Sequence, residues 1–196
     1  SEAPADARDL ASVESAPVSQ LVEFMLIRSD NVVAETLGRE VALATDREAS
    51  AAEAPSAVID ALAAQDLDTG SIALRDTSGL DYGNRISAGD LTTIIEASAQ
   101  AEGDLSMLVP AMPVAGFSGT LAPRYGADET EAGAGAVHAK TGALATVSSL
   151  SGTVVTADDR LLVFSMMADE MDRGASDEAR LAFDTALAQI AECGCS

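Results

Sequence analysis

Two short polar motifs carry residue types from which an active site can be built, Ser29-Asp30-Asn31 and Lys140-Thr141-Gly142. The first lies between two apolar helical patterns, where Ser29 and Asn31 could present a hydroxyl and a carboxamide to one cleft. A simpler interpretation is that Ser29 or Asp30 caps the second helix, because serine and aspartate are preferred at that position. The first motif alone leaves both roles open.

Lys140 is the only lysine among 11 basic residues, and the other ten are arginines. It could be a solvated lysine followed by a threonine that favours β-structure. Two features favour a functional role: the chain uses arginine everywhere else, and Gly142 weakens a strand unless something must approach the backbone closely. Because alternation sends Lys140 and Thr141 to opposite faces, both can reach one ligand only from an edge strand that lines a cleft.

Apolar spacing predicts the helices that position these motifs. One helix begins near Pro17 and ends near Arg28, and a second follows at once from Val32 to Val41, so the first motif lies between them. Further helices are predicted over 57–64 and from the N-cap Ser87 through Ile95. A last helix begins at Ser176, and its expected apolar set is Ala179, Leu181, Ala182, Phe183, Leu187 and Ile190.

Three strand-like runs, 137–144, 148–156 and 161–167, predict an antiparallel meander with Lys140 in its first strand. The expected fold class is therefore α+β, with an antiparallel sheet flanked by helices. Before the sheet we expect a short strand at 71–74, a structured loop at 110–125 and a small flexible segment at 130–136. The loop has four apolar side chains to bury: Met112, Val114, Phe117 and Leu121.

Composition excludes several classes of protein. The chain has 32 acidic residues and a formal charge of −21, which opposes binding to nucleic-acid phosphates. One histidine, His138, and the pair Cys193 and Cys195 are too few for a histidine-rich metal site, and we expect neither a metal nor a cofactor. No apolar run is long enough to span a bilayer. Since the chain begins without methionine or a signal-like stretch, we interpret it as a mature or excised piece.

Taken together, the two motifs resemble part of a known set. Serine acyl-transfer enzymes of the penicillin-binding protein and β-lactamase type carry S-x-x-K, S-D-N and K-T-G, and this chain has the last two in suitable settings. The segments between them resemble class C low-molecular-mass penicillin-binding proteins, which are D-alanyl-D-alanine carboxypeptidases and endopeptidases of peptidoglycan. The similar segments are Ser78-Gly79-Leu80, Asn84-Arg85-Ile86-Ser87 and 113–121.

The resemblance covers about Leu10 to Ile190 and implies that residues 1–196 are the C-terminal part of one transpeptidase-like domain. Within it we expect a helical region at about 15–65, a loop region at about 66–136, and the sheet with its terminal helix at about 137–192. Enzymes of this class act on peptidoglycan, so the resemblance also implies an extracytoplasmic location.

The nucleophile motif S-x-x-K cannot occur in these 196 residues, because Lys140 is the only lysine and Val137 stands three positions before it. In the family this motif lies far upstream, with two further strands, one of which pairs with the strand expected at 161–167. We therefore expect an N-terminal fragment of the same protein to accompany this chain, since that strand would otherwise be an exposed apolar edge. The alternative is a non-catalytic homologue that binds or scaffolds peptidoglycan. A β-lactamase or esterase on this fold is a third hypothesis, which the intervening segments disfavour.

The resemblance implies a mechanism in which the upstream serine attacks the terminal D-Ala-D-Ala bond and forms an acyl-enzyme that water hydrolyses. β-Lactams would acylate the same serine. Ser29 would relay a proton toward the leaving amine, and Asn31 would bind the peptide backbone of the substrate. Lys140 would hold positive charge in the cleft and help to orient Ser29.

The remaining residues of the second motif would bind substrate. Thr141 would bind its terminal carboxylate, Gly142 leaves space for its approach, and the N–H of Ala143 would donate to the oxyanion. Many relatives carry at position 143 a hydroxyl residue that also contacts the carboxylate. Arg85 and Arg124 are candidate additional cations, with ion-pair roles as the alternative.

Overall fold

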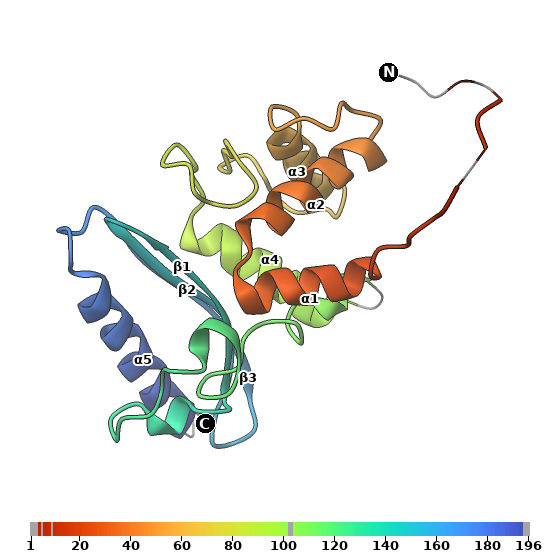
Figure 1. Cartoon of the computed structure of the whole chain (residues 1–196). Helices are drawn as coiled ribbons and strands as arrows, with labels where there is room; N and C mark the ends of the chain where they lie inside the picture. The colour runs from red at the N-terminus through yellow and green to blue at the C-terminus, as the bar shows by residue number, and fades with distance from the viewer. Residues whose placement is uncertain (1–3, 5, 9, 102–103, 194–196) are drawn as a thin grey trace.

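The structure, a computed structural model, describes residues 4, 6–8, 10–101 and 104–193. In this part of the chain five α-helices and three short 3₁₀-helices accompany one three-stranded antiparallel sheet. Figure 1 shows α5 along one face of the sheet and α1 to α4 gathered on its other side. The expected α+β architecture, an antiparallel sheet flanked by helices, is confirmed.

The first motif lies at the junction of two helices, as its spacing predicts. Helix α1 (Val18–Arg28) ends where Ser29 takes a left-handed conformation with φ of 52°. Helix α2 (Asn31–Ala44) begins two residues later, and its N-cap Asp30 accepts a hydrogen bond from the N–H of Val33 at 2.9 Å. This αL-then-cap sequence reverses the chain within two residues and holds both ends of the turn.

Two more helices complete the helical side. Helix α3 (Ala54–Ala63) packs against α2. Helix α4 (Ala88–Gln100) begins with a capping box in which Ser87 and Asp90 each bond the other's backbone N–H, so the predicted N-cap is confirmed. In the described part of the chain, no helix has the length and apolar content that crossing a membrane requires.

The sheet consists of β1 (Val137–Leu144), β2 (Val147–Val155) and β3 (Leu161–Ala168) in the order β1-β2-β3. Strand β1 is thus an edge strand of the described sheet. Alternate side chains face helix α5 (Ser176–Glu192) and form the main core, which includes Val137, Ala139, Leu150, Val154, Phe164, Leu187 and Ala191. Because the period of a strand is two, Thr141 lies on this core face and Lys140 on the opposite face.

Two expectations for the loop region were wrong in detail. Residues 71–74 form no strand, and the only pairing there is an isolated bridge between Ala73 and Arg85. In the loop at 110–125, Met112 and Leu121 are buried, but Phe117 is 73% exposed. The chain turns at Gly116, where φ is 76°, and the next side chain, Phe117, points outward.

The remaining two corrections concern segments near α5. Residues 130–136, expected to be flexible, contain the 3₁₀-helix η3 (Glu131–Gly133), and Gly133 lies against the ring of Tyr125 with no space for a side chain. On α5, Leu181 and Ala182 are exposed, whereas Asp184 is buried together with Leu187, Ala188 and Ala191. The apolar spacing missed this position because Asp184 places a carboxylate on the inner face of α5, where it pairs with the largely buried Arg124.

Candidate active site

A cleft of about 1750 Å³ lies between the helical side of the molecule and strand β1. The α1–α2 turn, β1, the 3₁₀-helix η2 (Gly119–Leu121) and the loop at 76–85 contribute to its lining. Every site residue predicted from the sequence lines this cleft: Ser29, Asn31, Lys140, Thr141, Gly142 and Ala143. The fold thus brings the two motifs together from opposite walls.

A direct hydrogen bond joins the two motifs. Lys140 Nζ donates to Ser29 Oγ at 2.8 Å, between residues 111 positions apart, and also to the carbonyl oxygen of Thr141 at 2.7 Å. Asp30 supplies the helix cap, which frees the Ser29 hydroxyl for the cleft. Capping and a place in the cleft were alternatives for the first motif. In the structure Asp30 caps the helix and Ser29 lines the cleft, so both roles are filled by neighbouring residues.

Lys140 is a half-buried cation without a carboxylate partner. The salt bridges among the described residues involve three arginines, Arg47, Arg124 and Arg180, and none includes Lys140. Burial lowers the pKa of Lys140, because desolvation disfavours its charged form. In a chain of formal charge −21, this side chain therefore offers a local positive site to an anionic ligand.

The outer edge of β1 directs backbone groups into the cleft. In its first half, the carbonyl of Val137 accepts from Ala115 N and the N–H of Ala139 donates to Pro113 O, both at 2.9 Å. Backbone direction alternates along an antiparallel strand, so Thr141 and Ala143 direct their backbone groups to the same edge. The bond from Lys140 Nζ to the Thr141 carbonyl agrees with this direction. Beyond the stretch covered by 113–115, this edge therefore faces the cleft.

Two neighbours of the second motif were not found from the sequence. Thr120 Oγ1 lies 2.9 Å from Thr141 Oγ1. Ser149, the cross-strand partner of Gly142, places its hydroxyl where a side chain at 142 would lie. Packing against Ser149 therefore explains a glycine at position 142 without reference to the substrate. A long-range hydroxyl contact has no periodic signal in sequence, so neither neighbour could be identified beforehand.

Two carboxylates hold the loop at 76–84 that forms part of the cleft wall. Glu35, one turn into α2, accepts from the N–H groups of Thr77 and Ser78 at 3.0 and 2.9 Å. Burial raises the pKa of Glu35, but hydrogen bonds from Ser78 and Thr77 outweigh it and leave that pKa below its ordinary value. The pKa of Asp76 is lowered in the same way, since burial is outweighed by bonds from its own loop, among them one from Asn84 Nδ2 at 2.7 Å.

The two candidate additional cations, Arg85 and Arg124, both have hydrogen-bond partners within the chain. Arg124 forms a bidentate ion pair with Asp184 at 2.9 and 2.5 Å, and both side chains are largely buried. Arg85 donates to the backbone carbonyls of Tyr82 and Asn84, both at 2.7 Å. For Arg124 the ion-pair alternative is therefore correct.

No metal centre is evident in the described residues, where no group of three or more His, Cys, Asp and Glu side chains could hold an ion. Of the two cysteines near the end of the chain, Cys195 lies outside those residues.

Comparison with known proteins assigns the family. Residues 1–190 match the model of the D-Ala-D-Ala carboxypeptidase 3 (S13) family, and the chain belongs to this family. It is 40% identical over 196 residues to a carboxypeptidase of Mycobacterium tuberculosis, covering 99% of this chain and 42% of that protein. It is also 38% identical over 188 residues to the carboxypeptidase DacB of Mycolicibacterium smegmatis, covering 95% and 40%. The chain spans about two-fifths of the length of these relatives.

Solved structures show the same fold. Penicillin-binding protein 4 of Haemophilus influenzae is similar with a TM-score of 0.78 and 28% identity, over 88% of this chain and 39% of that one. Its complex with a β-lactam gives a TM-score of 0.77 at the same identity, over 88% of this chain and 41% of that one. The resemblance to penicillin-binding proteins of the D-alanyl-D-alanine carboxypeptidase type is thereby confirmed.

Proposed function

We propose that the protein containing this chain is a serine-type D-alanyl-D-alanine carboxypeptidase, with endopeptidase action, that hydrolyses peptidoglycan stem peptides through an acyl-enzyme. The observation that carries the proposal is the bond from Lys140 Nζ to Ser29 Oγ, which joins the two motifs inside one cleft. Membership of the D-Ala-D-Ala carboxypeptidase family supports it. The attacking serine and its lysine belong to an S-x-x-K motif outside these 196 residues, on an N-terminal part of the same protein.

Ser29 carries a proton to the leaving amine. A lysine ammonium donates and cannot accept, so Ser29 Oγ accepts from Lys140 and its own hydrogen remains available to a group in the cleft. As Ser29 gives up this proton, Lys140 stabilises the oxygen and can replace the proton. The lowered pKa of Lys140, caused by its burial, makes that replacement easier.

The other cleft residues bind the substrate. The terminal carboxylate is attracted by the unpaired charge of Lys140 and accepts from the hydroxyl of Thr141. The N–H of Ala143, on the outer edge of β1, donates to the oxyanion of the tetrahedral intermediate. Losing such a donor typically costs about 2.7–4 kcal/mol of transition-state stabilisation. Asn31, the first residue of α2, bonds the peptide backbone of the substrate.

The N-terminal part also completes the fold. Residues 1–196 are the C-terminal part of one transpeptidase-like domain, with the helical, loop and sheet regions given above. In the described sheet β3 pairs only with β2, so its outer edge can accept a strand from the N-terminal part. Because peptidoglycan is the substrate, the protein acts outside the cytoplasm.

Labelling of the full-length protein with a fluorescent penicillin tests the proposal. Wild-type protein should form a covalent adduct that survives denaturation, the variant Lys140→Met should label much more slowly, and residues 1–196 alone should not label. Full-length protein that is folded but never labels would reject the enzyme in favour of a non-catalytic peptidoglycan-binding homologue. Rapid turnover of the penicillin would instead indicate a β-lactamase.

A further inference from the structure

Residues 118–125, here called the η2 segment, connect the two walls of the cleft. At Gly119, where φ is 57°, a side chain would meet the carbonyl oxygen of Ile27 at 2.7 Å and the ring of Pro113 at 3.0 Å. Ile27 lies two residues before Ser29, near the end of α1. The segment therefore packs directly against the helix end that carries the Ser29 hydroxyl.

The other end of the η2 segment is fixed to the sheet side of the molecule. Arg124 Nε and Nη2 bond the two carboxylate oxygens of Asp184 at 2.9 and 2.5 Å, and the Asp184 side chain is only 8% exposed. Asp184 belongs to α5, which packs on β1 and β2. A bidentate, largely buried pair restricts both the position and the orientation of the arginine. The segment is thus held against α1 at one end and α5 at the other.

Between these two anchors, Thr120 contacts the second motif. Its Oγ1 lies 2.9 Å from Thr141 Oγ1, and either hydroxyl can be the donor. Among the described residues, no other side-chain hydrogen bond is recorded for either hydroxyl. Each hydroxyl has one hydrogen to donate, so whichever one accepts in this pair retains a hydrogen for a ligand.

We propose that Thr120 is a positioning residue that directs the hydroxyl hydrogen of Thr141 toward the substrate carboxylate, a role that rests on the proposed function. An anion in the cleft selects the arrangement in which Thr120 donates to Thr141 and Thr141 donates to the carboxylate. Two hydroxyls donating in series polarise one another, so the first bond strengthens the second. Thr120 thereby favours substrates that end in a free carboxylate.

The test compares two thioester substrates that share an acyl group and differ in the leaving group, which ends in a carboxylate or in a carboxamide. Initial rates are measured with the full-length protein and with Thr120→Val, which keeps the shape of the side chain and removes the donor. The ratio of kcat/KM for the acid to kcat/KM for the amide should fall about three- to tenfold, the range for loss of one net hydrogen bond. Thr120→Ala should lower this ratio in the same direction, and Thr120→Ser should restore it.

Ser118→Ala is the matched control. Ser118 Oγ accepts from the N–H of Val114 at 2.9 Å, so this change loosens the same segment without touching Thr141. The acid-to-amide ratio should stay at the wild-type value even if stability falls. If Thr120 had a purely structural role, its substitution would lower kcat/KM for both substrates equally, or Ser118→Ala would reproduce the change in the acid-to-amide ratio. Either result would overturn the proposal.

Measurements on the wild-type protein distinguish a failure of the Thr120 proposal from a failure of the proposed function. If it hydrolyses both thioesters and labels with penicillin, but Thr120→Val keeps the wild-type ratio, only the role of Thr120 is rejected. If it hydrolyses neither thioester and does not label, the proposed function is rejected and the role of Thr120 with it.

Discussion

On the sheet wall of the cleft, Lys140 and Thr141 extend from a strand that packs with its partner strand on a buried core, whereas on the helical wall Ser29 lies in a two-residue turn and Asn31 begins α2. Val137 and Leu150, in β1 and its partner strand, have no exposed surface. By contrast, Leu26 is the only buried residue of α1. Packing therefore holds the sheet wall, while hydrogen bonds at helix ends and loops hold the helical wall.

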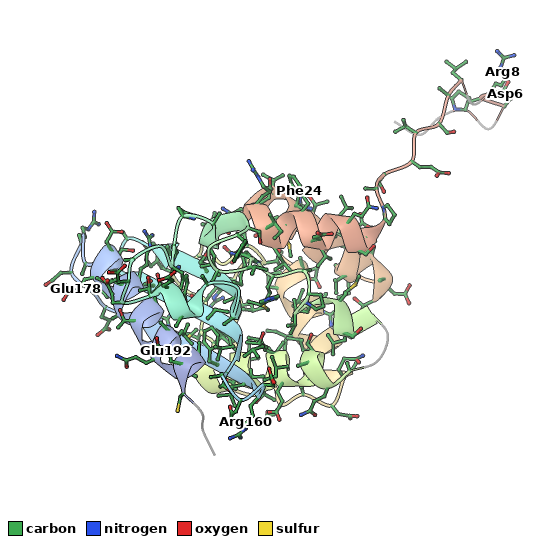
Figure 2. All side chains as sticks on the ribbon, turned by 90° about the horizontal axis from the view of Figure 1, so that it is seen from below. Asp6, Arg8, Phe24, Arg160, Glu178 and Glu192 are labelled. Carbon is green, nitrogen blue, oxygen red and sulfur yellow. The ribbon has the colours of Figure 1, made fainter. Side chains whose placement is uncertain are left out.

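Apolar surface on the helical wall sharpens this contrast. Val18, Phe24 and Val32 are exposed large hydrophobic residues on α1 and α2, and Figure 2 shows Phe24 on the outer surface of the molecule. Figure 2 also shows Asp6 and Arg8 away from the body of the protein. The helical wall thus has less burial of its own, so loss of a single hydrogen bond should matter more to its geometry.

The largest effect on stability is expected at Asp184. Its removal in Asp184→Ala leaves Arg124 buried without its partner, which should lower the free energy of unfolding by about 3–5 kcal/mol. Urea unfolding of the full-length protein measures this change. The control Asp177→Ala removes the exposed carboxylate that pairs with Arg180 and should cost no more than about 1 kcal/mol. Equal losses in the two variants would show that the buried pair is not an anchor.

Truncation in the core tests whether packing holds the sheet wall. Leu150→Ala should reduce the free energy of unfolding by about 2–5 kcal/mol, because it removes apolar burial and leaves a cavity. Leu161→Ala, in β3 of the same sheet, is the matched control because Leu161 is 54% exposed, and it should change stability much less. A small effect at Leu150 would contradict the assignment of the core to this face.

On the helical wall, the next prediction concerns Asp30, the N-cap of α2. Asp30→Ala should lower the free energy of unfolding by about 0.5–2 kcal/mol and should also slow penicillin labelling, because the Ser29 turn loses its fixed end. Asp30→Asn retains a capping oxygen and should restore most of both properties. Labelling at the wild-type rate in Asp30→Ala would mean that the Ser29 turn is held by something else.

The smallest effect should be the pH dependence contributed by Glu35. Its pKa in the folded protein lies below the ordinary value of 4.5, so its stabilising contribution is present above that value and is lost as pH falls through the folded pKa. Wild type should exceed Glu35→Gln in stability by up to about 1 kcal/mol at neutral pH. The difference should shrink in acid, as measured by urea unfolding at several pH values. A difference that grows in acid would contradict this sign.

The sequence predicts the sheet wall better than the helical wall. Strands of near-continuous apolar or alternating residues identify β1 to β3, and the S-D-N and K-T-G motifs indicate which residues meet in the cleft. The left-handed conformation of Ser29 and the division of roles between Ser29 and Asp30 depend on the exact reversal of the chain, which local preferences do not determine.

Long-range polar contacts are the part that sequence could not provide. Asp184 occupies a core position of α5 because Arg124, 60 residues earlier, neutralises it there, and a periodicity of apolar residues misses such a pair. The contact of Thr120 with Thr141 likewise depends on the path of the η2 segment. These contacts are set by tertiary packing rather than by the elements themselves.

The most direct test of the central claim is a double-mutant cycle at Ser29 and Lys140, read as the rate of acylation of the full-length protein by a penicillin. Each single change, Ser29→Ala and Lys140→Met, should slow acylation by about 10²–10⁴-fold if the pair works in proton transfer. Because the two side chains act through one hydrogen bond, the double variant should be about as slow as the slower single variant. Effects that multiply would show that Ser29 and Lys140 act independently, and would contradict a shared catalytic role for this pair.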